Sequence, residues 1–123
     1  MTATIRMIAI TSEGAALSDQ VDPRFGRAGG FLIVDLESMA TIYVDNGSSQ
    51  ALAQGAGIQA AENLAKAGAQ ALLTGHVGPK AFSALLACHV QVVQGIENMT
   101  VGEAVARFQA GELAWSDGPE AQP

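Results

Sequence analysis

Short runs of apolar, often β-branched residues alternate with glycine-rich or polar stretches along this chain. Runs of this length and composition are typical of buried strands. They predict five strands, at residues 5–11, 31–36, 41–45, 69–74 and 90–93. After the third, fourth and fifth strands the apolar residues recur every three to four positions. This spacing predicts three helices.

Each predicted helix has a recognisable beginning or end. The first covers residues 56–67 and stops at Gly68, since glycine readily adopts the left-handed conformation that ends a helix. The second opens at Pro79, because proline is tolerated in a first turn. The third begins at Thr100, which forms a capping-box pattern with Glu103, and ends at Gly111. The positions expected to face the core are Ile58, Ala61, Leu64 and Ala65 in the first helix, Phe82, Leu85 and Leu86 in the second, and Val101, Ala104, Val105 and Phe108 in the third.

The lengths of the connections predict how the strands are ordered. The link between the second and third strands is too short for a crossover, so these two strands run antiparallel. The last two strands each follow a helix and form parallel, right-handed crossover units. The order βββαβαβα therefore predicts an α/β fold: a mixed five-stranded sheet in the order 3-2-1-4-5, with strand 2 antiparallel and helices on both faces.

This topology brings four connections to one edge of the sheet, at residues 12–30, 46–57, 75–80 and 94–100. Open α/β sheets bind ligands outside the carboxyl ends of their strands. Most glycines of the chain lie in or beside these four connections, which makes this edge the candidate site.

Composition narrows the class of protein. The 123 residues are 49% hydrophobic, enough for one domain with its own core. We expect that domain to cover residues 1–115 and a flexible tail to follow at 116–123. A net charge of −6 with only six Lys and Arg disfavours nucleic acid and anionic membranes as partners. One cysteine excludes an internal disulfide and any site with several thiolates. No apolar run reaches the about 18 residues of a membrane span, and we expect a cytoplasmic protein.

The segment 22–30 (DPRFGRAGG) is the most unusual stretch. It places Arg24, Phe25, Gly26 and Arg27 in a glycine-rich loop, where backbone N–H groups and guanidinium groups could surround an anion. The alternative is a surface loop whose arginines are solvated or paired with Asp22.

Two further glycine motifs flank predicted helices. Gly55 and Gly57 precede the first helix in a weak G-x-G-x-x-A match, which is either an anion site at a helix N-terminus or a close packing contact. The segment 74–80 (TGHVGPK) joins a strand to a helix and could direct His76 and Lys80 at an anionic ligand. The alternative is an ordinary surface histidine. Gly75 and Gly78 belong to the same motif.

Cys88 and His89 are adjacent, but the topology places them at the opposite edge of the sheet. We interpret them as a small buried hydrophobic residue and a partly exposed histidine. No nucleophile, base and acid can be assembled from the sequence into a catalytic set, so we expect a protein that is not an enzyme.

These motifs together resemble the dinitrogenase iron–molybdenum cofactor-binding family. The resemblance covers about residues 5–113 and rests on IAIT, VDPRFGRAGGFLIVD, GAGIQAAENLAKAGAQALLTGHVGPKA and TVGEAVARFQAGEL. It implies a ribonuclease-H-like three-layer domain that binds a preformed metal–sulfur cluster, of molybdenum–copper sulfide or a related molybdenum or iron–sulfur type. It also implies an anaerobic bacterial or archaeal cytoplasm and, in some members, association with P-loop ATPases that position chromosomes or septa.

The resemblance and the residues agree on the nature of the ligand. A thiomolybdate-type cluster is a polyanion whose sulfides already saturate its metals, so it needs N–H donors, cations and an apolar wall and not protein thiolates. We therefore expect non-covalent binding by Arg24, Phe25, Gly26, Arg27, Gly55, Gly57, Gly75, His76, Gly78 and Lys80, with no direct ligation of metal. Two alternatives remain: a regulatory module that responds to a small anion or a nucleotide through the same edge, and an enzyme that uses His76 and Lys80.

Overall fold

The computed structural model describes residues 5–47, 55–116 and 118. Its five strands are β1 (Met7–Ser12), β2 (Gly30–Asp35), β3 (Thr41–Asp45), β4 (Ala71–Leu73) and β5 (Gln91–Val93). Its helices are α2 (Ala56–Lys66), α3 (Pro79–Ala87) and α4 (Val101–Gln109). The predicted element order is confirmed, and most predicted boundaries shift by one or two residues. Most of the predicted connection at 46–57 lies outside the described residues.

The five strands form one mixed sheet in the order β3-β2-β1-β4-β5, as the sequence predicts. Strand β2 runs antiparallel to both of its neighbours, with Ile10 opposite Leu32 and Leu32 opposite Tyr43. Strands β1, β4 and β5 are parallel, with Ile10 beside Leu73 and Leu73 beside Val93. The carboxyl ends of these three parallel strands therefore lie at the same edge of the sheet.

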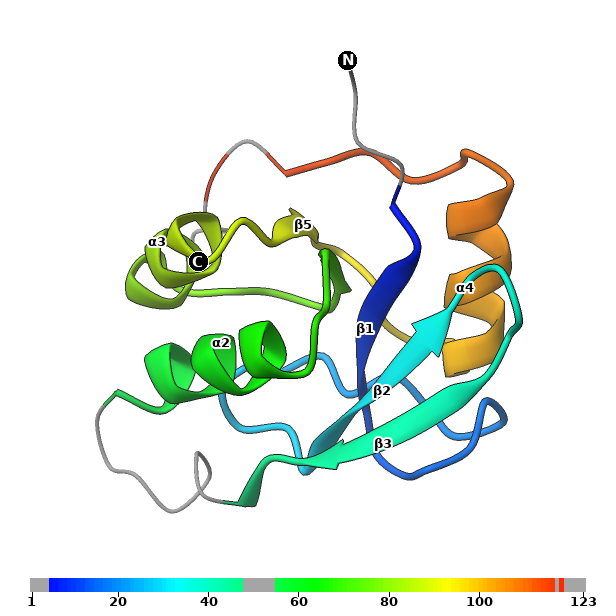
Figure 1. Ribbon diagram of the computed structural model, residues 1–123, viewed down its shortest axis with the longest axis horizontal. Helices are drawn as coiled ribbons and strands as arrows, with labels where there is room; N and C mark the ends of the chain where they lie inside the picture. Colours follow the sequence, from blue (N-terminus) through cyan, green and yellow to red (C-terminus); the bar gives the residue numbers. More distant parts are fainter. Residues whose placement is uncertain (1–4, 48–54, 117, 119–123) are drawn as a thin grey trace.

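Helices cover both faces of this sheet and make three layers (Figure 1). Helices α2 and α3 lie side by side on one face, over a core that includes Ala9, Phe31, Ile33, Leu72 and Val92. The alternate strand residues, including Ile8, Ile10, Leu32, Val34 and Leu73, form a second core beneath α4. This alternation is the period-two pattern of a sheet that is buried on both faces.

Two apolar helix positions do not face the core as predicted. Ile58 in the first turn of α2 is 39% exposed, and Leu86 near the end of α3 is 54% exposed. Phe82 and Leu85 of the same helix are buried. The buried positions are Ala56, Ala60, Ala61 and Leu64 in α2, and Ala81, Phe82 and Leu85 in α3. With about 3.6 residues per turn, Ile58 lies on the far side of α2 from its buried positions and Leu86 lies at the flank of α3, so neither side chain faces the sheet.

The N-terminus of α4 is capped as predicted, but by half of the capping box. Thr100 Oγ1 accepts a hydrogen bond from the N–H of Glu103 at 3.1 Å. The Glu103 carboxylate turns along the helix and forms an ion pair with Arg107 at 3.2 Å.

The segment after α4 is attached to the strand β5. The N–H of Ser116 binds Val92 O at 2.8 Å, and the N–H of Gln94 binds Ser116 Oγ at 3.1 Å.

The predicted tail at residues 116–123 begins with Ser116, which is hydrogen-bonded to the domain in this way. Besides Ser116, the carbonyl oxygen of Gly118 accepts a hydrogen bond from Gln94 Nε2 at 2.9 Å. Residues 117 and 119–123 of the predicted tail lie outside the described part of the chain. Within the described residues, no helix is both long enough and apolar enough to cross a membrane.

Candidate functional site

A cavity of about 660 Å³ opens at the carboxyl edge of the sheet, between the first turns of α2 and α3. Three connections supply its lining, from Arg24 to Arg27, from Gly55 to Ile58, and from His76 to Ala81 without Val77. The volume is in the range of ordinary ligand pockets. The sequence predicted an edge site built from these three connections. The fourth connection, 94–100, does not line the cavity.

Local backbone chemistry explains why both helices begin at this cavity. Gly55 precedes α2 with a φ of 77°, a left-handed conformation that glycine adopts without steric cost. Gly78 precedes α3 in an extended conformation, and Pro79 then fixes the helical φ of the first turn. Both helix N-termini, which carry partial positive charge, therefore lie at the rim of one cavity.

The two loops on the sheet side of the cavity are joined through their backbones. The N–H of His76 binds Pro23 O at 3.0 Å, and Arg24 and His76 pair as in a parallel sheet. Gly75 permits this contact, since a Cβ at this position would lie 2.4 Å from Pro23 O. The N–H of Val77 binds Gln94 Oε1 at 2.6 Å on the other side of the loop. These bonds fix the backbone that carries His76.

A buried hydrogen-bond network supports the Arg24 loop from below. Asp22 and Thr11 are joined by a backbone bond from Asp22 N–H to Thr11 O at 2.9 Å. Thr11 Oγ1 also binds Asp22 O, and it lies 2.9 Å from Thr74 Oγ1. All three residues are buried, with Thr11 near the end of β1, Thr74 just after β4, and Asp22 in the loop between β1 and β2. The loop is therefore anchored to the edge of the sheet by satisfied polar groups.

Arg24 is paired with Asp22, which is one of the two roles that the sequence offers for an arginine outside a ligand contact in this loop. The Asp22 carboxylate accepts hydrogen bonds from the backbone N–H, Nε and Nη2 of Arg24, at 3.0, 3.2 and 3.3 Å. The Asp22 side chain is 6% exposed and that of Arg24 is 60% exposed. The hydrogen bond with Asp22, followed by its charge, raises the pKa of Arg24. Part of the Arg24 charge is therefore neutralised inside the protein.

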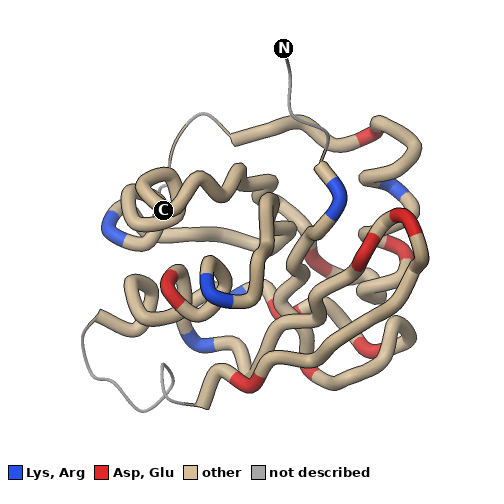
Figure 2. Tube along the Cα trace, in the orientation of Figure 1, with Lys and Arg blue, Asp and Glu red and all other residues tan. Residues whose placement is uncertain are grey.

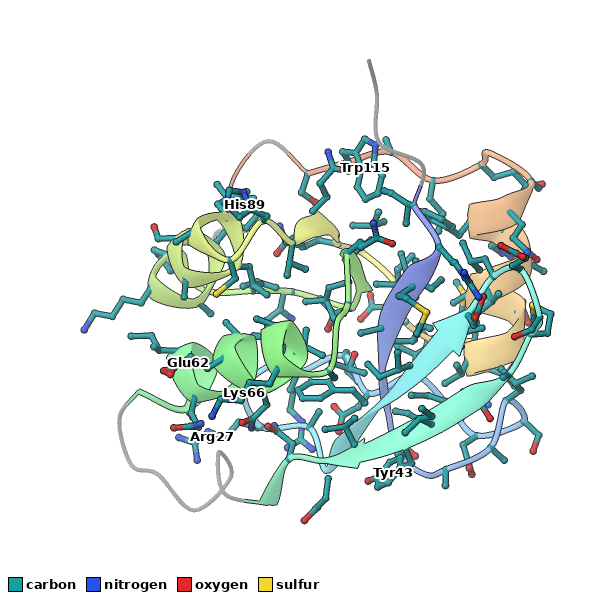
Figure 3. All side chains as sticks on the ribbon, viewed as in Figure 1. Arg27, Tyr43, Glu62, Lys66, His89 and Trp115 are labelled. Carbon is teal, nitrogen blue, oxygen red and sulfur yellow. The ribbon has the colours of Figure 1, made fainter. Side chains whose placement is uncertain are left out.

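Arg27 and Lys80 bring two further cationic side chains to the cavity. Both are exposed, and they approach it from different elements, the loop before β2 and the first turn of α3. Figure 3 shows Arg27 beneath α2 in this view. His76 also lines the cavity, and its side chain is partly buried. No carboxylate lines the cavity among the described residues, although the whole chain carries a net charge of −6.

The rest of the cavity wall is apolar or backbone. Phe25 lines it from the core, where its ring lies 5.7 Å from that of Phe31. Ile58, in the first turn of α2, also lines the cavity and is partly exposed. Gly57 packs against α3, because a Cβ at this position would lie 2.6 Å from the Cβ of Ala81. The close packing contact, which the sequence offered as one of two roles for Gly57, is therefore present between α2 and α3.

Nine of the ten predicted site residues line this one cavity, and Gly75 does not. Gly75 instead lies in the close contact with Pro23. Pro79 of the predicted motif 74–80 also lines the cavity, and the lining residues that the sequence did not single out are Ala56, Ile58 and Ala81. Their positions in the first turns of two predicted helices were the available signal. Whether the lining binds a ligand stays a prediction.

Cys88 lies at the opposite edge, as the topology predicts. It lines a second cavity of about 510 Å³ with Gln70, His89 and neighbouring residues at the amino ends of the parallel strands. Its side chain packs partly against the core beneath α2 and α3. No group of three or more His, Cys, Asp or Glu side chains within residues 5–47, 55–116 and 118 could hold a metal ion.

The fold and the cavity define a class of protein, an α/β domain with a pocket of cationic and apolar lining at the carboxyl edge of a mixed sheet. Residues 5–111 match the family described as dinitrogenase iron–molybdenum cofactor, and the chain belongs to this family.

Two solved structures show the relationship in detail. The apo form of the orange protein from Desulfovibrio gigas is 53% identical, with a TM-score of 0.94 over 98% of this chain and 100% of that one. A candidate NifB protein from Thermotoga, of the DUF35 family, is 34% identical, with a TM-score of 0.82 over 97% and 100% of the two chains. No curated protein matches the chain.

Proposed function

We propose that this protein carries a preformed, anionic metal–sulfur cluster, held non-covalently in the cavity between α2 and α3. The cluster is of molybdenum–copper sulfide or iron–molybdenum type. One observation supports this most directly: the lining combines Arg24, Arg27 and Lys80 with apolar groups and includes no carboxylate among the described residues. The cluster is cargo in this proposal, and the protein is a carrier and not a catalyst.

The donors at the cavity suit an anion that brings its own ligands. Guanidinium and ammonium groups bind anionic acceptors through charge-assisted hydrogen bonds. Two helix N-termini add partial positive charge at the same rim. Terminal and bridging sulfides can accept all of these interactions, so the metals need no bond to protein. The single thiol, that of Cys88, lines the other cavity.

The apolar wall favours a sulfide cluster over a small oxyanion or a nucleotide phosphate. Phe25, Ile58 and Ala81 offer no hydrogen bonds from their side chains. A strongly hydrated phosphate would lose water against such a wall without compensation. A larger and softer sulfide cluster can contact apolar carbon and keep its charged edge towards Arg27 and Lys80.

Reconstitution of the apo chain tests the proposal. The protein is mixed with tetrathiomolybdate and a copper(I) salt, desalted, and analysed for visible absorption and for bound molybdenum, copper and sulfide. Lys80→Ala removes one charge from the cavity rim. Lys66→Ala is the matched control, since Lys66 is an exposed lysine in the last turn of α2 that does not line the cavity.

We expect Lys80→Ala to retain severalfold less chromophore than the wild type, because a charge-assisted contact contributes about 1.5 kcal/mol or more when water is excluded. Lys66→Ala should retain as much as the wild type. Equal losses in the two variants would show that only net charge matters and would contradict binding in this cavity. Failure of the wild type to retain any metal would contradict the carrier function itself.

A further inference from the structure

One edge strand of the sheet, β5, is covered by another segment of the chain, whereas the other edge strand, β3, is not covered by any described strand. At the β5 edge, the N–H of Ser116 binds Val92 O at 2.8 Å, so the segment after α4 covers this strand. At the other edge, β3 pairs with β2 and with no further strand of the described residues (Figure 1). An uncovered edge is a template for another strand, and proteins commonly protect it with lysine, proline or a bulge. Strand β3, Thr41–Asp45, contains neither lysine nor proline.

The pairing register shows which backbone groups of β3 face outwards. The N–H of Asp35 binds Ala40 O, and the N–H of Asn46 binds Gly29 O, both at 2.9 Å. Hydrogen-bonded pairs alternate along an antiparallel ladder. With the register of β2 and β3, the backbone groups of Ile42 and Val44 therefore face β2. Those of Thr41, Tyr43 and Asp45 face away from the sheet.

The side chains beside this outward edge differ between the two faces. On the face of α2 and α3, Ile42 is 63% exposed. On the other face, Tyr43 lies across Gly30, where a Cβ would meet its ring, and it stays 37% exposed. Figure 3 shows Tyr43 at the outer side of β3. One face of the edge is therefore apolar and uncovered, while the other presents Thr41, Tyr43 and Asp45.

The face with Tyr43 is also acidic. Burial, and then the carboxylates of Asp45 and Asp19, raise the pKa of Tyr43, which places both carboxylates near its hydroxyl. No basic residue in the described part of the chain forms an ion pair with Asp45 or Asp19. Figure 2 shows acidic segments gathered on the side of the molecule that carries β2, β3 and α4. The uncovered edge therefore carries uncompensated negative charge.

We propose that β3 accepts an extended segment of a partner protein as a sixth strand, and that basic and apolar residues alternate along this segment. Main-chain hydrogen bonds to Thr41, Tyr43 and Asp45 would provide the attachment, as in other cases of strand addition. Alternate side chains of the added strand point to opposite faces. Its apolar residues cover Ile42, and its basic residues face Asp45 and Asp19. This surface is separate from the cavity, so the inference does not depend on the proposed cargo.

Amide hydrogen exchange followed by NMR tests the geometry and the partner chemistry together. In the free protein, Ile42 and Val44 should exchange slowly and Thr41, Tyr43 and Asp45 quickly, because only the first two amides bond to β2. The probe is the synthetic peptide acetyl-Lys-Val-Lys-Val-Lys-Val-Lys-amide. At saturation it should slow exchange at the three outward amides by about tenfold. A peptide with the same residues arranged in two blocks is the control.

Two pairs of variants locate the interaction. Asp45→Asn should weaken peptide binding about threefold, while Glu62→Gln, which removes an exposed charge from α2, should leave it unchanged. Thr41→Pro removes an outward N–H at the first residue of an edge strand, where proline is tolerated. This variant should abolish the added protection, and Thr41→Val should keep it. An unchanged NMR spectrum elsewhere in Thr41→Pro confirms that the fold is intact.

Three results would overturn the inference. The first is equal protection by the alternating and the block peptide, which would reduce the effect to non-specific charge. The second is no change at Thr41, Tyr43 and Asp45 with either peptide. The third is protection of these amides that rises with protein concentration alone, which would make a second copy of this chain the occupant of the edge.

Discussion

The ion pair between Arg24 and Asp22 allows the charge at the cavity rim to be varied in steps of one unit. Arg24→Ala leaves the Asp22 carboxylate, 6% exposed, without the Nε and Nη2 bonds at 3.2 and 3.3 Å. The bond from the backbone N–H of residue 24 remains. Arg24 is more than half exposed, so water replaces part of what is lost. We expect a loss of about 1–2 kcal/mol in the free energy of unfolding.

The double variant Asp22→Asn/Arg24→Ala should recover most of that loss. A neutral amide needs no counter-charge, and its oxygen can still accept the backbone N–H of residue 24. Urea denaturation of the wild type, Arg24→Ala and the double variant measures the recovery. If the double variant unfolds as easily as Arg24→Ala, the buried carboxylate is not the source of the loss.

The same variants predict the order of anion affinities. The pair has a net charge of zero in the wild type and in the double variant, −1 in Arg24→Ala and +1 in Asp22→Asn. A sphere of the cavity's volume, about 660 Å³, has a radius of about 5 Å, and Asp22 does not line it, so we take about 10 Å as the working separation between its carboxylate and a bound anion. At that distance and an effective dielectric constant of about 20, a unit charge contributes about 1.7 kcal/mol per ligand charge. Salt at 0.1 M reduces this to about 0.6 kcal/mol, or about threefold in affinity.

Tetrathiomolybdate is a dianion, so neutralising Asp22 should lower its dissociation constant about eightfold, both in Asp22→Asn against the wild type and in the double variant against Arg24→Ala. Equilibrium dialysis read by visible absorption measures these constants in 0.1 M salt. Asp22→Asn should bind most tightly and Arg24→Ala most weakly, with the double variant between Arg24→Ala and the wild type, because Arg24 lines the cavity and Asp22 does not. A double variant as weak as Arg24→Ala would refute this reasoning, because the two variants differ only in the Asp22 charge.

Two further predictions concern the packing of the site and its distance from the thiol. Gly57→Ala should lower the free energy of unfolding by about 1–3 kcal/mol, because its Cβ would lie 2.6 Å from that of Ala81; adding Ala81→Gly should recover part of this in urea denaturation, and an unchanged midpoint in the single variant would contradict the contact. Cys88→Ala should keep the visible absorption and metal content of the reconstituted protein, because the nine residues of α3 separate Cys88 from the cavity by about 13 Å. Loss of the absorption with the fold intact would place the cluster at the thiol.

The sequence by itself determined the architecture of this protein. The connection 37–40 was too short for a crossover, and two later strands each followed a helix, so strand order and direction followed from chain geometry. The same topology placed Arg24, Gly55 and His76 at one edge and Cys88 at the other. These conclusions rest on local periodicity and on the handedness of crossovers, both of which can be read along a single chain.

Only the tertiary structure decided what each residue does at that edge. The sequence could not choose between a solvated Arg24 and one paired with Asp22, because the choice depends on how deeply the fold buries the carboxylate. It placed Gly75 in the ligand site, whereas the glycine admits the carbonyl of Pro23 from another loop. Ile58 and Leu86 have the spacing of core residues, but periodicity alone does not reveal which of two overlapping apolar faces a helix turns towards the sheet. Contacts between distant segments depend on packing in three dimensions, and the order of residues along the chain does not specify them.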